Sequence, residues 1–230
     1  KDVKPYKFEV FKYIFLAKIF GLTFAIKNME NKEKKIQERY FLVLSKIPDV
    51  KKILENEKGH EDKLVKLIKE EKLEYTSSIV LGLNDALVEI TGALAGLSLA
   101  LQNTRLIGVV GLITGLSAAL SMAASEYLSQ KSETSGKNPS KAAVYTGAAY
   151  LIAVSLLVLP YFILSFYYVA LILTLLVAMC IILFFSYFIS VTKGFSFKRK
   201  FFEMLIVSFG VALISFFIGY VTRVLFGIRV

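Results

Sequence analysis

The sequence predicts an all-α membrane protein: a five-span transmembrane helical bundle preceded by an N-terminal cytosolic helical segment. Of its 230 residues, 56% are hydrophobic and the mean hydropathy is +0.61, which is too apolar for a soluble domain of this length. The charges are unevenly distributed, because residues 1–78 contain 18 of the 28 Lys and Arg and 13 of the 18 Asp and Glu. We therefore expect a charged N-terminal part (residues 1–28 and 29–75) and a membrane domain over 76–230.

Residues 1–28 predict an amphipathic helix that lies on the inner membrane surface. Apolar residues recur there at helical spacing, and charged residues interrupt them too often for a full span. The apolar stripe consists of Phe8, Phe11, Phe15, Ile19, Leu22 and Ile26. Basic charge in this stretch favours anionic lipid headgroups. A helix that packs on the following hairpin would fit the same pattern, so both interpretations stay open.

Residues 29–75 predict a helical hairpin with a candidate metal site. Pro48 fits the first turn of the second helix. Glu57 and the chain's one histidine, His60, have the Glu-x-x-His spacing that di-iron helical bundles use together with a Glu from a partner helix. In an antiparallel hairpin, residues at equal distances from the turn lie side by side, which pairs Glu57 with Glu38. One hairpin supplies only half of a di-iron site, so the other half must come from upstream residues or a second copy.

Five windows after residue 75 are long enough to cross a bilayer, since a hydrocarbon core of about 30 Å needs about 20 helical residues. They lie at 79–101, 106–128, 142–164, 167–191 and 202–226. Basic residues follow the second and fourth windows, which predicts that these loops and the N-terminus are cytoplasmic and that the C-terminus is on the opposite side. Because Cys180 is the single cysteine, we expect no disulfide and no cysteine metal site.

The first span carries two carboxylates in a stripe of small residues. The residues Gly82, Asp85, Glu89, Gly92 and Gly96 follow one another at spacings of 3, 4, 3 and 4. An ionised carboxylate at the bilayer centre costs at least about 2.5–3.5 kcal/mol. No Lys or Arg lies within the first two spans, so each acid is expected to bind a cation or take up a proton. The small-residue faces of spans one and two are expected to meet each other or to form a homodimer.

Met122 and Glu126 in the second span extend this pattern into a candidate transport path. Counting from the span ends places Met122 level with Asp85, about 9 Å inside the cytoplasmic boundary, and places Glu89 deeper. Carboxylates suit Fe²⁺ and Mn²⁺, and a thioether adds a preference for transition ions over Mg²⁺ or Ca²⁺. Glu126 lies near the cytoplasmic mouth, where it either lines the path or extends to the interface.

The segments GLNDALVEITGALAGLSLAL and GLITGLSAALSMAASEYLSQKSE resemble the first two spans of the vacuolar iron transporter family, which includes plant and yeast carriers. The resemblance implies five spans, a dimeric pore, and export of Fe²⁺ or Mn²⁺ from the cytosol in exchange for protons. It matches Asp85 with the family's first-span aspartate and Met122 with its second-span methionine. Plant members have a glutamate at the position of Thr114, and in this chain Glu89 would supply that missing carboxylate. They also have a long Glu-rich insert after span two, where this chain has a short loop.

The charged hairpin also resembles the rubrerythrin and ferritin-like family, whose spacing before Tyr40 would select Glu33 in place of Glu38. The two resemblances predict an integral membrane transporter of Fe²⁺ or Mn²⁺ with a metal-gathering module, in the plasma membrane of a prokaryote. The alternative is a membrane-anchored ferritin-like protein that oxidises or stores iron; a dimeric scaffold is a third interpretation. We find no phosphate-binding loop, catalytic Ser or Cys arrangement or nucleic-acid motif, so we expect a non-enzyme.

Overall fold

The computed structural model describes residues 7–21, 24–32, 75–133 and 136–227. These residues are almost entirely helical, which confirms the all-α class. They divide into two compact units, one built from the N-terminal segment together with Ile189–Phe195, and the other from Tyr75–Phe188 together with Ser196–Val230. The predicted hairpin ligands Glu33, Glu38, Glu57 and His60 lie outside the described residues, so the metal site predicted there stays a prediction.

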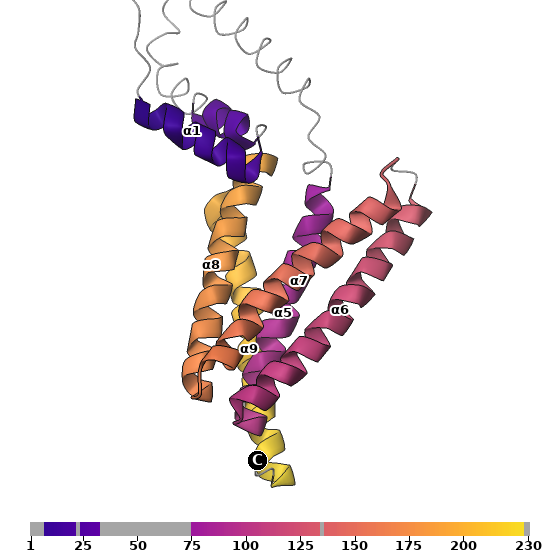
Figure 1. Ribbon diagram of the computed structural model, residues 1–230, viewed down its shortest axis with the longest axis vertical. Coiled ribbons are helices and arrows are strands. Elements are labelled where there is room, and N and C mark those ends of the chain that lie inside the picture. The colour runs from indigo at the N-terminus through magenta and orange to yellow at the C-terminus, as the bar shows by residue number, and fades with distance from the viewer. Residues whose placement is uncertain (1–6, 22–23, 33–74, 134–135, 228–230) are drawn as a thin grey trace, which may run out of the picture. The chain divides into compact units, whose positions relative to one another are not determined.

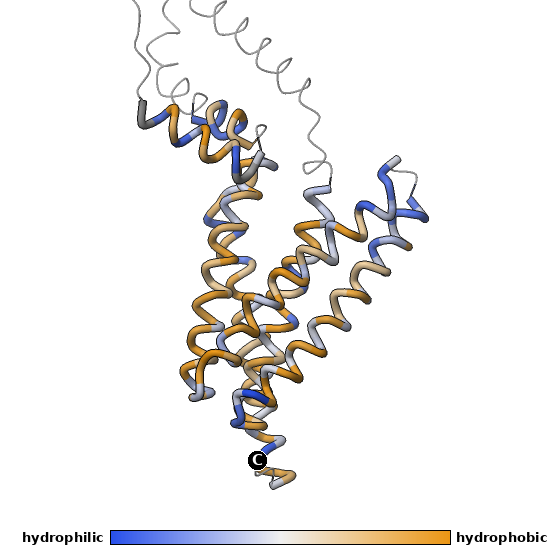
Figure 2. The backbone as a smooth tube through the Cα atoms, in the orientation of Figure 1, coloured by the Kyte–Doolittle hydropathy of each residue, from blue (hydrophilic) through white to orange (hydrophobic). Residues whose placement is uncertain are grey.

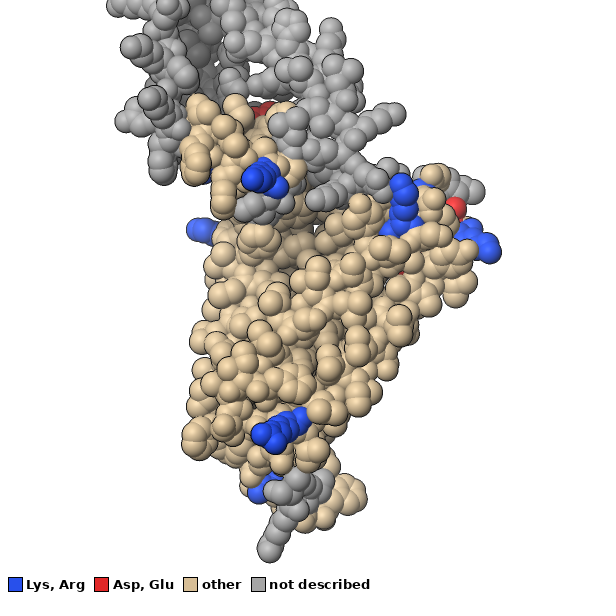
Figure 3. Space-filling view, viewed as in Figure 1, with Lys and Arg blue, Asp and Glu red and all other residues tan. Residues whose placement is uncertain are grey.

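Five helices are long and apolar enough to cross a membrane, as predicted (Figures 1 and 2). They are α5 (Thr76–Leu101), α6 (Thr104–Ser132), α7 (Pro139–Ile163), α8 (Tyr167–Lys193) and α9 (Phe197–Phe226). Each helix contains most of its predicted window and extends beyond it at one end or both, because polar residues continue the helix past the hydrocarbon boundary. In Figure 3, Lys and Arg gather at the ends of these helices and leave the flank between them largely uncharged.

Short turns separate the spans, and asparagine side chains cap two of the helices. The Asn103 side chain caps α6 by accepting a hydrogen bond from the amide of Leu106 at 3.1 Å. The Asn138 side chain caps α7 by accepting from the amides of Ser140 and Lys141. Pro160 lies inside α7, and the turn into α8 occupies only residues 164–166. Because the turns are this short, consecutive spans run in opposite directions.

Helix α5 is the centre of the five-helix unit, because it contacts α6, α7 and α9. Glycines allow the closest of these contacts. A methyl group added to Gly82 would overlap the backbone of Thr146 in α7, and one added to Gly219 in α9 would overlap the carbonyl oxygen of Gly96. A methyl group on Gly96 would lie 2.9 Å from the carbonyl oxygen of Ser215. The α5–α9 crossing therefore depends on two facing glycines.

The glycine stripes contact other helices than the sequence predicted. Gly92 and Gly96 face α9, and Gly82 faces α7. On α6, Gly108 and Gly115 face α7, and only Gly111 lies against α5, at Leu94. The expectation that the small-residue faces of spans one and two meet each other is therefore wrong for most of these glycines. A glycine permits close approach by whichever helix crosses there, and the spacing alone does not select the partner.

Candidate metal-transport site

The face of α5 that carries the carboxylates is open over two turns in the part of the chain that the structure describes. Leu81 and Glu89 are exposed and Asp85 is half-buried, at spacings of four residues. Ala86 and Ile90 on one side of this strip, and Leu87 on the opposite face of the helix, are fully buried. Asp85 and Glu89 are one helical turn apart, so their side chains are neighbours. Two acids thus lie on an open strip of a membrane-spanning helix.

Tyr150 of α7 holds Glu89 by a short hydrogen bond. Its hydroxyl donates to Oε2 of Glu89 at 2.6 Å, and the tyrosine itself is fully buried. This distance is in the range typical of a hydroxyl that donates to a carboxylate. The contact becomes possible because Gly82 lets the backbone of α7 approach α5 at Thr146, one turn before Tyr150. One oxygen of Glu89 is thereby fixed, and the other stays available to a ligand.

Sequence reasoning missed Tyr150. The available signal was a tyrosine within an apolar span, because a buried tyrosine hydroxyl usually finds a hydrogen-bond partner. The signal does not identify the partner, since Tyr161 in the same helix instead pairs with Ser98, with 2.7 Å between their hydroxyl oxygens. Only the packing of α7 on α5 decides which tyrosine meets a carboxylate.

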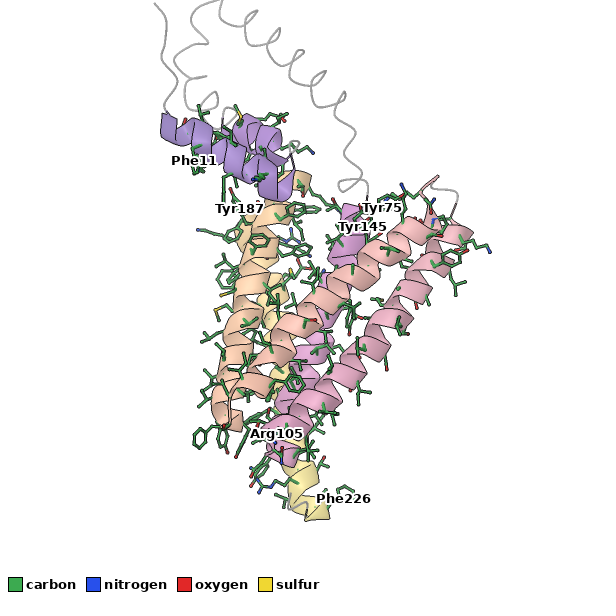
Figure 4. All side chains as sticks on the ribbon, in the orientation of Figure 1. Phe11, Tyr75, Arg105, Tyr145, Tyr187 and Phe226 are labelled. Carbon is green, nitrogen blue, oxygen red and sulfur yellow. The ribbon has the colours of Figure 1, made fainter. Side chains whose placement is uncertain are left out.

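Glu126 is turned into the protein at the end of α6. It is only 7% exposed, and its Oε1 accepts a hydrogen bond from the Ser78 hydroxyl at 2.7 Å. Thr146 donates to the carbonyl oxygen of Ser78 at 3.1 Å, so α5, α6 and α7 are linked at this level. Next to this link, Tyr75 stacks on Tyr145 with 5.1 Å between ring centroids (Figure 4). Glu126 is therefore buried against α5 and does not extend to the interface, and its place on a transport path stays a prediction.

Met122 and Asp85 lie at similar depths. Two contacts define the register of the antiparallel pair α5 and α6: Leu94 lies against Gly111, and Ser78 bonds to Glu126. In this register Asp85 is opposite residues 119–120 of α6. Met122 therefore lies about 4 Å closer than Asp85, along the helix axis, to the level of Glu126. Met122 is half-buried. The depth difference is less than one helical turn, which a long thioether side chain can span.

The described residues of one copy do not complete a metal site. In residues 7–21, 24–32, 75–133 and 136–227, no three His, Cys, Asp or Glu side chains form a group that could hold an ion. Thr114, at the position of the plant glutamate, is exposed and donates to the Val110 carbonyl oxygen in its own helix. One further oxygen is notable: the side-chain carbonyl of Asn84 is buried and has no hydrogen-bond partner. Within the described residues, Asp85 and Glu89 would therefore supply only a partial set of ligands.

Comparison with known proteins identifies the membrane domain. Residues 76–135 and 131–220 match the profile of the VIT family, and together these matches cover more than half of the chain. No curated protein matches the chain significantly. The matched region contains Asp85, Glu89, Met122 and Glu126 and includes all five apolar helices except the end of α9. This integral membrane protein belongs to the VIT family, and it is a membrane transporter of metal ions of the iron and manganese class.

Proposed function

We propose that the protein exports Fe²⁺ or Mn²⁺ from the cytosol in exchange for protons, along a path lined by Asp85 and Glu89. The observation that supports this most directly is the state of Glu89. It lies exposed on a membrane-spanning helix, yet a fully buried tyrosine holds one of its oxygens. An oriented carboxylate with a free oxygen is suited to bind a cation. A carboxylate facing lipid would instead cost at least about 2.5–3.5 kcal/mol.

A second copy of the chain is the proposed cover for this face. Within the described residues, the ion pairs are Lys32–Glu9 and Lys200–Glu203, and neither involves Asp85 or Glu89. A symmetric partner would place a second pair of carboxylates and a second Met122 opposite the first. The partial set of ligands in one copy would then become a complete one. The dimer thus explains both the open strip on α5 and the incomplete site.

Proton exchange follows from the absence of a compensating charge. When no metal is bound, carboxylates in a membrane are less costly if protonated. Metal binding requires the ionised form, so metal entry releases protons and proton entry releases metal. Carboxylates with a thioether favour Fe²⁺ or Mn²⁺ over Ca²⁺. The direction of export rests on topology, because the ends of the helices on either side of the turns after α6 and α8 carry the basic residues that favour the cytoplasmic side.

The test is metal flux in proteoliposomes with an imposed pH gradient. Asp85→Asn should abolish flux, because it removes a ligand and a titrating group while keeping the size of the side chain. The matched control is Glu133→Gln, which neutralises an exposed acid at the end of α6 and should transport as the wild type does. Wild-type flux by the Asp85→Asn protein would refute the proposal. Loss of His60 should leave flux intact, whereas a ferritin-like protein with a membrane anchor would show no flux at all.

A further inference from the structure

The described N-terminal helices, within residues 7–32, form a hairpin that is attached to the end of a membrane span; it is called the hairpin below and is not the predicted metal-binding hairpin of residues 29–75. Helix α1 (Lys7–Phe20) and helical residues 24–32 are joined at Gly21, whose φ of 95° suits a glycine. Lys32 approaches Glu9 at 3.7 Å and lies 5.5 Å from the ring centroid of Tyr13. These contacts fix the two helices against each other, and Phe24 is fully buried.

The second helix of the hairpin binds the last turn of α8. Lys27 donates to the carbonyl oxygen of Thr192 at 2.9 Å, and Asn31 donates to that of Val191 at 3.4 Å. These carbonyls are among the last four of α8, which have no partner within their own helix. The predicted window of this span ends at residue 191, so the carbonyl oxygens that the hairpin binds are those at the predicted end of the apolar stretch.

One face of α1 is apolar and is not covered by any of the residues that the structure describes. Tyr13, Leu16 and Ala17 are half-buried, so they mark the side that packs within the hairpin. On another side, Phe11 is 69% exposed and Ile14 is 59% exposed, and Val10 and Phe15 next to them are exposed as well (Figure 4). Spacings of one, three and one residue place these four side chains on a single face. We name this set, Val10, Phe11, Ile14 and Phe15, the apolar face of α1.

We propose that the apolar face of α1 inserts into the headgroup region of the bilayer around α8, as a membrane-surface helix that recognises anionic lipid. Two observations select lipid as the occupant. The attachment at Thr192 and Val191 keeps the face within reach of the surface, since a helix with its side chains is about 10–12 Å wide. The segment is also basic, because residues 7–32 contain five Lys against two Glu. Lys12 and Lys18 are exposed on α1 itself, where their long stems can extend to phosphate groups.

Tryptophan fluorescence in the full-length protein tests this proposal, because the natural sequence contains no Trp. Phe11→Trp and Ile14→Trp each put one reporter on the apolar face at an exposed position, where the new ring displaces no packed neighbour. The proteins are reconstituted into phosphatidylcholine and phosphatidylglycerol vesicles whose acyl chains are brominated at shallow or deep carbons. Ile172→Trp, on an exposed part of α8, is the lipid control, and Glu133→Trp, at the end of α6, is the water control.

The Phe11→Trp and Ile14→Trp proteins should be quenched several-fold more than the Glu133→Trp protein. Shallow bromines should quench more than deep ones, because a surface helix is buried only about 5–10 Å. Quenching no greater than in the Glu133→Trp protein would overturn the proposal, and a blue-shifted emission without quenching would show that protein covers the face instead. Replacing phosphatidylglycerol by phosphatidylcholine should weaken quenching of the Phe11→Trp protein but not of the Ile172→Trp protein. Equal quenching in both vesicles would refute anionic recognition.

Discussion

Replacing Tyr150 by Phe removes the one hydroxyl that donates to Glu89 and leaves the ring in place. The lost bond is 2.6 Å long, and its acceptor is a carboxylate. Hydrogen bonds to charged groups contribute about 1.5–3 kcal/mol in soluble proteins. Side-chain hydrogen bonds between membrane helices average about 0.6 and reach about 1.7 kcal/mol. We therefore expect a loss of about 1 kcal/mol, which acts only on the ionised form of Glu89.

The expected effect on metal binding follows from the role of the hydroxyl. The hydroxyl orients one carboxylate oxygen of Glu89, so without it the carboxylate must be ordered when a metal ion binds. Because about 1.4 kcal/mol is a factor of ten in an equilibrium constant, a loss of about 1 kcal/mol should raise the metal concentration of half-maximal flux about fivefold. The assay is initial Fe²⁺ or Mn²⁺ flux in proteoliposomes over a series of metal concentrations.

Tyr161→Phe is the matched control, because it removes an equally buried hydroxyl from the same helix whose partner, Ser98, carries no charge. This variant should keep the wild-type dependence of flux on metal concentration even if its stability falls. An unchanged dependence in Tyr150→Phe, or the same change in both variants, would refute the role assigned to the bond between Tyr150 and Glu89.

Three other predictions concern the dimer, the metal preference and the packing of α5. In a Cys180→Ser background, Leu81→Cys should form cross-links between copies, because Leu81 shares the open strip with Glu89. Ile206→Cys, on an exposed part of α9, should not form them. Cross-linking of both variants to the same extent would argue against the proposed interface. Met122→Leu should keep the fold and lower the flux ratio of Fe²⁺ to harder ions, and an unchanged ratio would remove Met122 from the path. Gly219→Ala should destabilise the protein by about 1–3 kcal/mol in detergent unfolding, because the added methyl group overlaps Gly96. Gly210→Ala in the same helix has no atom within 4 Å of its added methyl and should stabilise by up to about 1 kcal/mol, so equal effects would contradict the α5–α9 contact.

The sequence by itself determined the five spans, because helix formation in a bilayer depends on local properties. A backbone without water must satisfy its own hydrogen bonds, so about 20 apolar residues in a row are sufficient evidence for a spanning helix. Family membership was also readable in the sequence, since the residues around Asp85 and Met122 carry it. The helix ends were readable in part: the predicted windows 142–164 and 167–191 leave the turn after α7 in its place, although the helices extend past most of the other predicted ends.

The tertiary structure decided which partner each side chain has. The stripe from Gly82 to Gly96 was recognised as a contact face, but the contacts are with α7 and α9 and not with α6. Only this packing brings Tyr150, Ser78 and Thr146 to the site. Residues of different helices meet according to the crossing angle and the register of the helices, which no local sequence pattern encodes. The carboxylates could be predicted from their cost in a membrane, which is a property of each residue alone. Their hydrogen-bond donors could not, because a donor in a neighbouring span is selected by geometry.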